Sequence, residues 1–88
     1  MSKQNKQIIR LLRRPKDYTF NEMETLLISL GFELHNAGGT SGSAVRFINH
    51  SNGHIIRLHK PHPQPELKPY LVAMIINELK KGGYLDGK

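Results

Sequence analysis

Apolar and polar side chains alternate with two different periods along this chain of 88 residues. Apolar residues three and four positions apart predict amphipathic helices, whereas apolar residues at every second position predict half-buried strands. In chain order we expect a helix over residues 3–14, a helix over 21–30, strands over 32–36, 44–49 and 54–59, and a helix over 68–81. This order predicts an α+β fold, a two-layer sandwich of three antiparallel strands with helices on one face, plus an extra N-terminal helix.

Local signals mark the ends of these helices. Thr19 and Glu22 have the spacing of a capping box at the start of the second helix, and Gly31 supplies the left-handed residue that ends it. Pro15 ends the first helix. Pro69 suits the first turn of the last helix, where its missing N–H costs nothing.

A hairpin is expected to join the second and third strands. Asn52-Gly53 is a strong signal for a two-residue turn. A turn of that length would place Phe47 opposite Leu58 on the buried face of the sheet. It would also place Arg46 opposite His59 on the open face.

The positive charge of the chain lies in its first helix. Six basic residues precede the first acidic one, Asp17, and from there on seven basic and seven acidic residues balance, so the formal charge of +6 belongs to residues 1–16. A helix of about 12 residues is marginal alone. Its basic face either attracts phosphates or is simply solvated. We expect it to dock on the domain of residues 17–88 through an apolar stripe of Ile8, Leu11 and Leu12.

Composition excludes several classes of protein. There is no cysteine, which rules out disulfides and cysteine-ligated zinc. No apolar run reaches the roughly 18 residues that span a bilayer, and no apolar stretch of about 7–15 residues follows the basic N-terminus, so we expect no secretory signal. We therefore expect a cytoplasmic protein with no membrane partner, no cofactor and no bound metal.

A proline-rich bridge leads from the last strand into the last helix. Its prolines stiffen it towards polyproline II, because each also biases the residue before it away from the α region. The bridge carries Lys60, His62 and Lys68 beside the positively polarised N-terminus of the last helix. We interpret this stretch as an anion site.

Two of the five histidines are candidates for catalysis, His59 at the end of the last strand and His62 between prolines. An imidazole titrates near neutrality and can act as a general acid or base. Cleavage of RNA by its own 2′-hydroxyl needs such a group together with cations that stabilise the charge on phosphorus. The cations available are Arg46, Arg57, Lys60 and Lys68. The remaining histidines are interpreted as surface or turn residues: His35, His50 and His54.

The glycine-rich segment over residues 37–43 lacks the Gly-Lys-Ser/Thr of a nucleotide-binding loop, and it joins two strands. It is interpreted either as a long hairpin loop or as a loop whose N–H groups approach a phosphate backbone. In the second case Gly42 and Ser43 shape the contact with RNA.

Several short motifs, taken in their order, resemble the HicA-type toxins of bacterial toxin–antitoxin pairs. They are Leu27-Ile28-Ser29-Leu30-Gly31-Phe32-Glu33-Leu34, Gly42-Ser43 with Phe47, the hairpin at Asn52-Gly53, Pro61-His62 and Glu66-Leu67-Lys68-Pro69. The resemblance covers roughly residues 22–85. It implies a double-stranded-RNA-binding-like fold and a ribosome-independent mRNA interferase, an endonuclease that a HicB-type antitoxin neutralises by covering the active face.

The chain departs from the family pattern at one position. The family motif is Gly-Ser-His, whose histidine is catalytic, whereas here Gly42-Ser43 is followed by Ala44. Three explanations are open: a disabling substitution, a subfamily that uses another residue such as His59 or His62, or a binding protein without activity. If the chain is an enzyme, we expect a metal-independent endoribonuclease, a hydrolase that uses a histidine as general acid or base. The alternative is a non-catalytic module that binds nucleic acid or the antitoxin.

Overall fold

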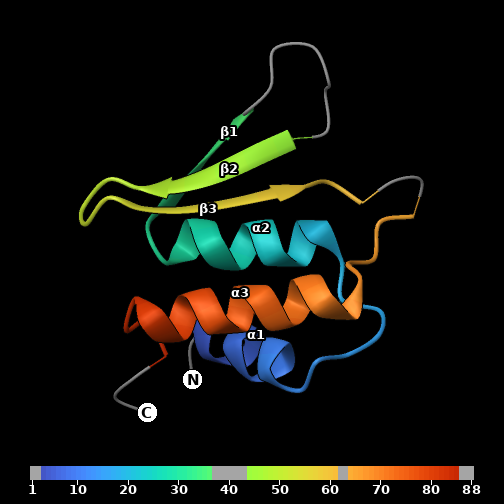
Figure 1. Ribbon diagram of the computed structural model, residues 1–88. Helices are drawn as coiled ribbons and strands as arrows, with labels where there is room; N and C mark the ends of the chain where they lie inside the picture. The colour runs from blue at the N-terminus through green and yellow to red at the C-terminus, as the bar shows by residue number, and fades with distance from the viewer. Residues whose placement is uncertain (1–2, 37–43, 62–63, 86–88) are drawn as a thin grey trace.

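The computed structural model describes residues 3–36, 44–61 and 64–85 (Figure 1). Its elements are α1 (Lys3–Leu12), α2 (Phe20–Ser29), β1 (Phe32–Asn36), β2 (Ala44–Asn49), β3 (His54–His59) and α3 (Pro69–Lys81). The strand bounds are those expected from the sequence, and the helices differ from expectation by one or two residues at their ends. No helix in these ranges is long and apolar enough to cross a membrane.

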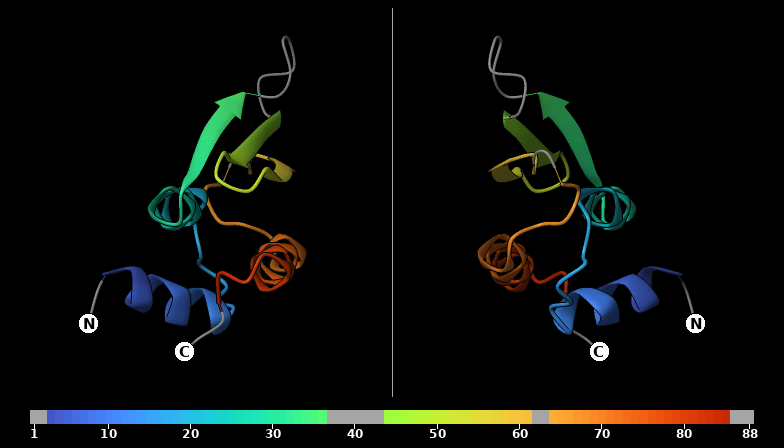
Figure 2. Two further views of the ribbon diagram at one scale, coloured as in Figure 1. Left: turned by 90° about the vertical axis from the view of Figure 1, so that its left-hand side faces the viewer. Right: turned by 90° about the vertical axis from the view of Figure 1, so that its right-hand side faces the viewer.

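The three strands form one antiparallel sheet in the order β1-β2-β3. Both α2 and α3 lie on the same side of this sheet, and α1 contacts the two helices from the side away from it (Figures 1 and 2). The predicted α+β fold, with helices on one sheet face and an extra N-terminal helix, is therefore confirmed. No described helix covers the other face of the sheet.

The helix α1 is part of the hydrophobic core. Leu11 is fully buried and belongs to the same cluster as the buried side chains of the sheet and of the other helices, and Ile8 packs against that cluster. Leu12 is 44% exposed, so its predicted place in the docking stripe is wrong. The helix α1 ends at Leu12, and Arg14 then turns the chain with a left-handed φ of 53°.

Polar contacts fix α1 against the start of α2. Arg10 donates from Nε to Glu22 Oε2 at 2.6 Å and from Nη2 to Glu22 Oε1 at 3.1 Å. The same carboxylate accepts the N–H of Thr19 at 3.0 Å while the Thr19 hydroxyl accepts the N–H of Glu22 at 3.2 Å, which confirms the predicted capping box. Hydrogen bonds from Arg10 lower the pKa of the Glu22 carboxyl. Gly31, with φ of 101°, ends α2 as predicted.

The loop between β2 and β3 differs from the expected two-residue turn, because residues 50–53 all lie between the strand ends Asn49 and His54. Asn49 organises this loop. Its carbonyl accepts the N–H of Gly53 at 2.7 Å, and its Oδ1 accepts the N–H and the hydroxyl of Ser51 at 3.1 and 2.6 Å. Its Nδ2 donates to the hydroxyl of Tyr84 at 2.8 Å, which ties the loop to the chain beyond α3.

The longer loop changes the strand register. Arg46 pairs with Arg57, and Ala44 pairs with His59. The predicted pairing of Arg46 with His59 is therefore wrong, and so is that of Phe47 with Leu58. Each partner is displaced by two residues, so the side chains keep the faces that alternation assigned to them. The open face carries the residues expected on it, but their neighbours across the strands differ from those expected.

Candidate nucleic-acid interface

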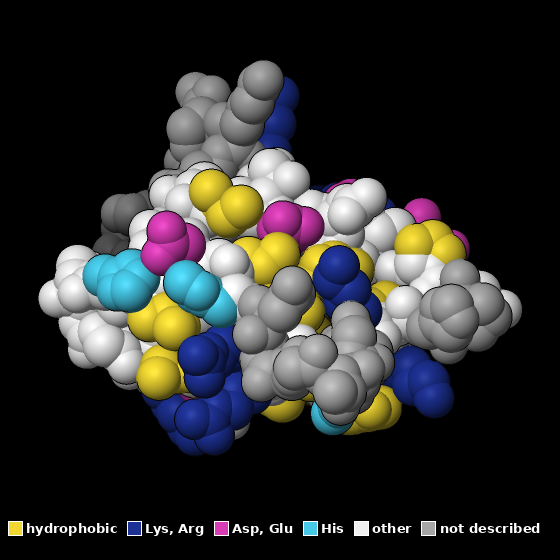
Figure 3. Space-filling model, turned by 90° about the horizontal axis from the view of Figure 1, so that it is seen from above, with side chains coloured by type: hydrophobic (Ala, Val, Ile, Leu, Met, Phe, Trp, Pro, Cys, Tyr) yellow, Lys and Arg dark blue, Asp and Glu magenta, His cyan; other side chains and the backbone are white. Residues whose placement is uncertain are grey.

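The sheet face away from the helices carries histidine, basic, acidic and apolar side chains together (Figure 3). Residues that pair across neighbouring strands point to the same face and stand side by side. Three rows on this face follow from the register: Glu33–Ile48–Ile55, His35–Arg46–Arg57 and, on β2 and β3, Ala44–His59. Both arginines and His59 therefore occupy neighbouring rows of one open face.

Arg46 and Arg57 form the unusual pair of this face. Like charges directly opposite each other destabilise a strand pair, and among the described residues no carboxylate forms a salt bridge with either guanidinium. In addition, Arg46 Nε is buried and has no hydrogen-bond partner among the residues that the structure describes. A phosphate bound on this face would supply the missing negative charge.

His59 lies next to Ala44, the position that the resemblance assigns to the catalytic histidine of the family. His59 is exposed at the end of β3, and Ala44 is the first residue of β2. Both point to the open face. The imidazole of His59 thus lies on the strand next to position 44, where the family pattern has a histidine and this chain has alanine.

An open groove of about 450 Å³ follows the β3 edge towards the start of α3. It brings together four side chains predicted as site residues, namely Arg57, His59, Lys60 and Lys68. Glu66 is the single acidic residue in the lining. The groove is therefore a cationic channel with an imidazole in it, which suits a phosphate backbone.

The segment on one side of this groove is attached to the start of α2. The N–H of Phe20 donates to the carbonyl of Pro65 at 3.0 Å, and the N–H of Leu67 donates to the carbonyl of Tyr18 at 2.8 Å. The side chain of Leu67 is buried in the core. Lys60 Nζ lies 5.5 Å from the centre of the Phe20 ring. Backbone hydrogen bonds and the buried side chain of Leu67 therefore hold this side of the groove in place.

A model of the HicA toxin family of bacterial toxin–antitoxin systems matches residues 20–83. The chain belongs to the HicA toxin family. Membership implies the toxin of a toxin–antitoxin system, with a cognate antitoxin as partner. No curated protein and no solved structure matches the chain at a significant level. The part that matches the HicA toxin model begins at the first residue of α2 and leaves α1 out, although α1 shares the core.

Three residues that the resemblance to HicA toxins points to, Gly42, Ser43 and His62, lie outside the described residues. Among the groove residues that sequence reasoning did not name as site residues is Tyr70, which is 67% exposed in the first turn of α3. An exposed ring can stack on an unpaired base. The signal was available, since Tyr70 lies off the apolar stripe of its helix.

The other histidines of this HicA toxin each contact a carboxylate. His35 Nε2 and His50 Nε2 lie 3.1 and 2.7 Å from the same oxygen of Glu33, and these hydrogen bonds lower the pKa of the Glu33 carboxyl. His54 Nε2 lies 2.8 Å from Glu78 Oε1, and the side chain of His54 is only 18% exposed. The interpretation as surface or turn residues holds for His50 and fails for His54, whose side chain is largely buried against Glu78 of α3.

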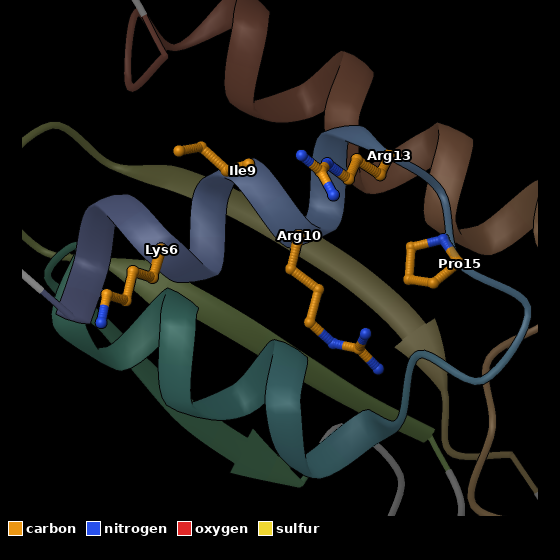
Figure 4. A pocket seen from close by; sticks show the side chains of 5 residues that line it. All are labelled: Lys6, Ile9, Arg10, Arg13 and Pro15. Carbon is orange, nitrogen blue, oxygen red and sulfur yellow. The ribbon is translucent and has the colours of Figure 1, made fainter.

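A shallow hollow on α1 gives a second cationic surface (Figure 4). The side chain of Arg10 extends towards α2, and it forms salt bridges with Glu22 of that helix and with Asp17 before it. The hollow contains neither an imidazole nor a carboxylate, so it offers charge without a group for proton transfer. Its lining is Lys6, Ile9, Arg10, Arg13 and Pro15.

Proposed function

We propose that this HicA toxin binds mRNA and cleaves it with His59 as its general base. The observation that supports this most is the pairing of His59 with Ala44 on the open sheet face. Directly paired residues have Cβ atoms about 4.5–5.5 Å apart. An imidazole from β3 can therefore reach the volume that a histidine at position 44 would occupy. In this proposal the chain represents a subfamily in which the base has moved to the neighbouring strand.

In the proposed reaction, the 2′-oxygen of a ribose attacks the adjacent phosphorus, and the bond from phosphorus to the 5′-oxygen of the next nucleotide breaks. His59 takes the proton of the 2′-hydroxyl, and water protonates the leaving 5′-oxygen. Arg46 and Arg57 stabilise the negative charge that accumulates on the phosphorane oxygens. The products are a 2′,3′-cyclic phosphate and a 5′-hydroxyl, and the step uses no metal.

The groove beside β3 supports binding of a single strand. Lys60 and Lys68 line it together with Arg57 and can contact successive phosphates, while Tyr70 offers a stacking surface for a base. Sequence-specific proteins bind RNA mostly through unstacked single-stranded bases, which such a ring can hold. Binding of this kind weakens steeply with salt, by roughly 0.7 in the logarithmic slope for each phosphate contact on a single strand.

Cleavage of a labelled single-stranded RNA in the presence of EDTA tests the proposal. We expect the native protein to cut, His59→Ala to lose cleavage by about 10²–10⁴-fold, the usual contribution of a general base, and RNA affinity to be largely kept. Lys81→Ala, which removes an exposed cation at the end of α3, is the control and should cut like the native protein. Full activity of His59→Ala would overturn the assignment of the base.

Ala44→His separates the remaining explanations. Intact RNA with an excess of native protein, together with cleavage by Ala44→His, would identify the chain as a catalytically impaired relative. If neither the native protein nor Ala44→His cleaves RNA, but the native protein binds RNA in a salt-dependent way, the chain would be a non-catalytic binding module. The alanine at position 44 is compatible with that alternative. Fluorescence anisotropy at several salt concentrations measures that binding independently of cleavage.

We also propose that the antitoxin is of the HicB type and covers the same open face. The face combines Arg46 and Arg57, which form no salt bridge with a described residue, and Ile55, which is 42% exposed, so a partner could bury apolar surface and neutralise charge together. Co-purification with the product of an adjacent reading frame, and competition between that product and RNA, are the expected results. Simultaneous binding of both would contradict the shared face.

A further inference from the structure

We propose that Glu33, His35 and His50 form a binding site for a divalent metal ion of intermediate softness, such as Zn²⁺, at the β1 side of the open face. Each side chain offers one ligand atom, and these atoms all lie within 4.8 Å of one another. This site goes beyond RNA cleavage, which is proposed to proceed without a metal. It is also separate from the groove beside β3, whose lining contains none of the three residues.

The backbone brings these ligands together. Glu33 and His35 are two residues apart on β1 and therefore point to the same face. His50 follows Asn49, whose partner across the strands is Phe32, the residue before Glu33. The hydrogen bonds of Asn49 to Leu30 and Ser51 hold the loop that carries His50. Metal binding would thus require only side-chain rotations.

The chemistry of the three donors selects the metal. Two imidazole nitrogens and one carboxylate oxygen suit Zn²⁺, Ni²⁺ or Cu²⁺, whereas Mg²⁺ and Ca²⁺ prefer oxygen ligands alone. Both imidazoles already approach one oxygen of Glu33, His35 Nε2 at 3.1 Å and His50 Nε2 at 2.7 Å. The metal would replace the protons shared in these hydrogen bonds. Its other coordination positions would face solvent, because all three side chains are at least 41% exposed.

Two features limit the affinity. Arg46 pairs with His35 across the strands, so a positive charge stands beside the site. Among the described residues, neither imidazole has a second hydrogen-bond partner that would orient it, and such partners strengthen metal sites. We expect a reversible site that binds Zn²⁺ or Ni²⁺ more tightly than Mg²⁺, and more weakly than buried four-ligand zinc sites.

Calorimetric titration of the untagged protein with Zn²⁺, Ni²⁺ and Mg²⁺ tests the site. We expect one Zn²⁺ per chain, a loss of affinity of at least about tenfold in both His35→Ala and His50→Ala, and a similar loss in Glu33→Gln. His59→Ala removes an imidazole from the same face outside the site and should bind Zn²⁺ like the native protein. Circular dichroism shows whether each variant is folded.

A second readout locates the ion without any activity measurement. In imidazole ¹⁵N spectra, Zn²⁺ should shift the ring nitrogens of His35 and His50 together and leave those of His54 and His59 unchanged. The site is refuted if millimolar Zn²⁺ gives no binding, or if both histidine variants bind as the native protein does. Either result leaves the RNA proposal standing, since cleavage in EDTA tests that proposal separately.

Discussion

Replacing Leu11 with alanine tests whether α1 belongs to the folded unit of this HicA toxin or is an appendage to it. Leu11 has no exposed surface and lies in the common core, whereas its neighbour Leu12 is 44% exposed. The two leucines are adjacent in one helix and differ in burial. Leu12→Ala is therefore a matched control for the change in helix propensity.

The expected magnitude follows from this burial. Truncation of a buried leucine to alanine costs about 2–5 kcal/mol, through lost transfer free energy and the cavity left behind. Leu11→Ala should thus lower the free energy of unfolding by about 3 kcal/mol, a large part of the roughly 5–15 kcal/mol of a typical domain. For a chain of this size that corresponds to a fall in Tm of about 12–24 °C. Leu12→Ala should stay within about 0.5 kcal/mol of the native protein.

Urea unfolding followed by circular dichroism measures both variants. The midpoint of Leu11→Ala should fall while the slope of the transition stays constant, which indicates a change in stability alone. If Leu11→Ala lost less than about 1 kcal/mol and behaved like Leu12→Ala, α1 would not be packed as described. Preserved stability after removal of residues 1–16 would refute the same reasoning more directly.

Three further predictions concern the cap of α2, its end and the groove. Arg10 lowers the pKa of the Glu22 carboxyl, so their contact stabilises the fold above the ordinary carboxyl pKa of 4.5. This stabilisation is lost as the pH falls through the lowered pKa. The urea midpoint of Glu22→Gln should therefore fall less in acid than that of the native protein. Gly31→Ala should cost about 1–3 kcal/mol in the same assay, because φ is 101° and a Cβ would stand 3.3 Å from Asn49 Nδ2; a cost near zero would contradict this. Tyr70→Ala should weaken single-stranded RNA binding by about 1–3 kcal/mol in an anisotropy titration and leave the thermal unfolding midpoint unchanged.

The features that could be predicted from the sequence are those set by neighbours along the chain. The capping box needs only Thr19 and Glu22, and the end of α2 needs only Gly31, because both depend on backbone groups within one turn. Strand bounds and faces followed from alternation for the same reason. His59 could be named as a candidate because it is the last residue of the strand before the proline-rich segment.

The features that could not be predicted depend on contacts far along the chain. The hairpin loop takes its length from Asn49, whose amide bonds to Tyr84 beyond the last helix. The grouping of Glu33 with His50 depends on the register of β1 with β2, which no short motif specifies. Leu12 was assigned to the core from its spacing to Ile8, whereas its exposure depends on how α1 is rotated against the other helices.

The loop between β2 and β3 decides which side chains meet at the opposite end of the hairpin. A two-residue turn would put Arg46 beside His59 and leave Ala44 without that imidazole, although every residue of the face would be unchanged. Under the proposed mechanism, a different turn at the tip alone would therefore place or remove the imidazole beside position 44 in related toxins. Comparison of HicA sequences by aligned columns would overlook such a change, whereas the strand register in each structure would show it.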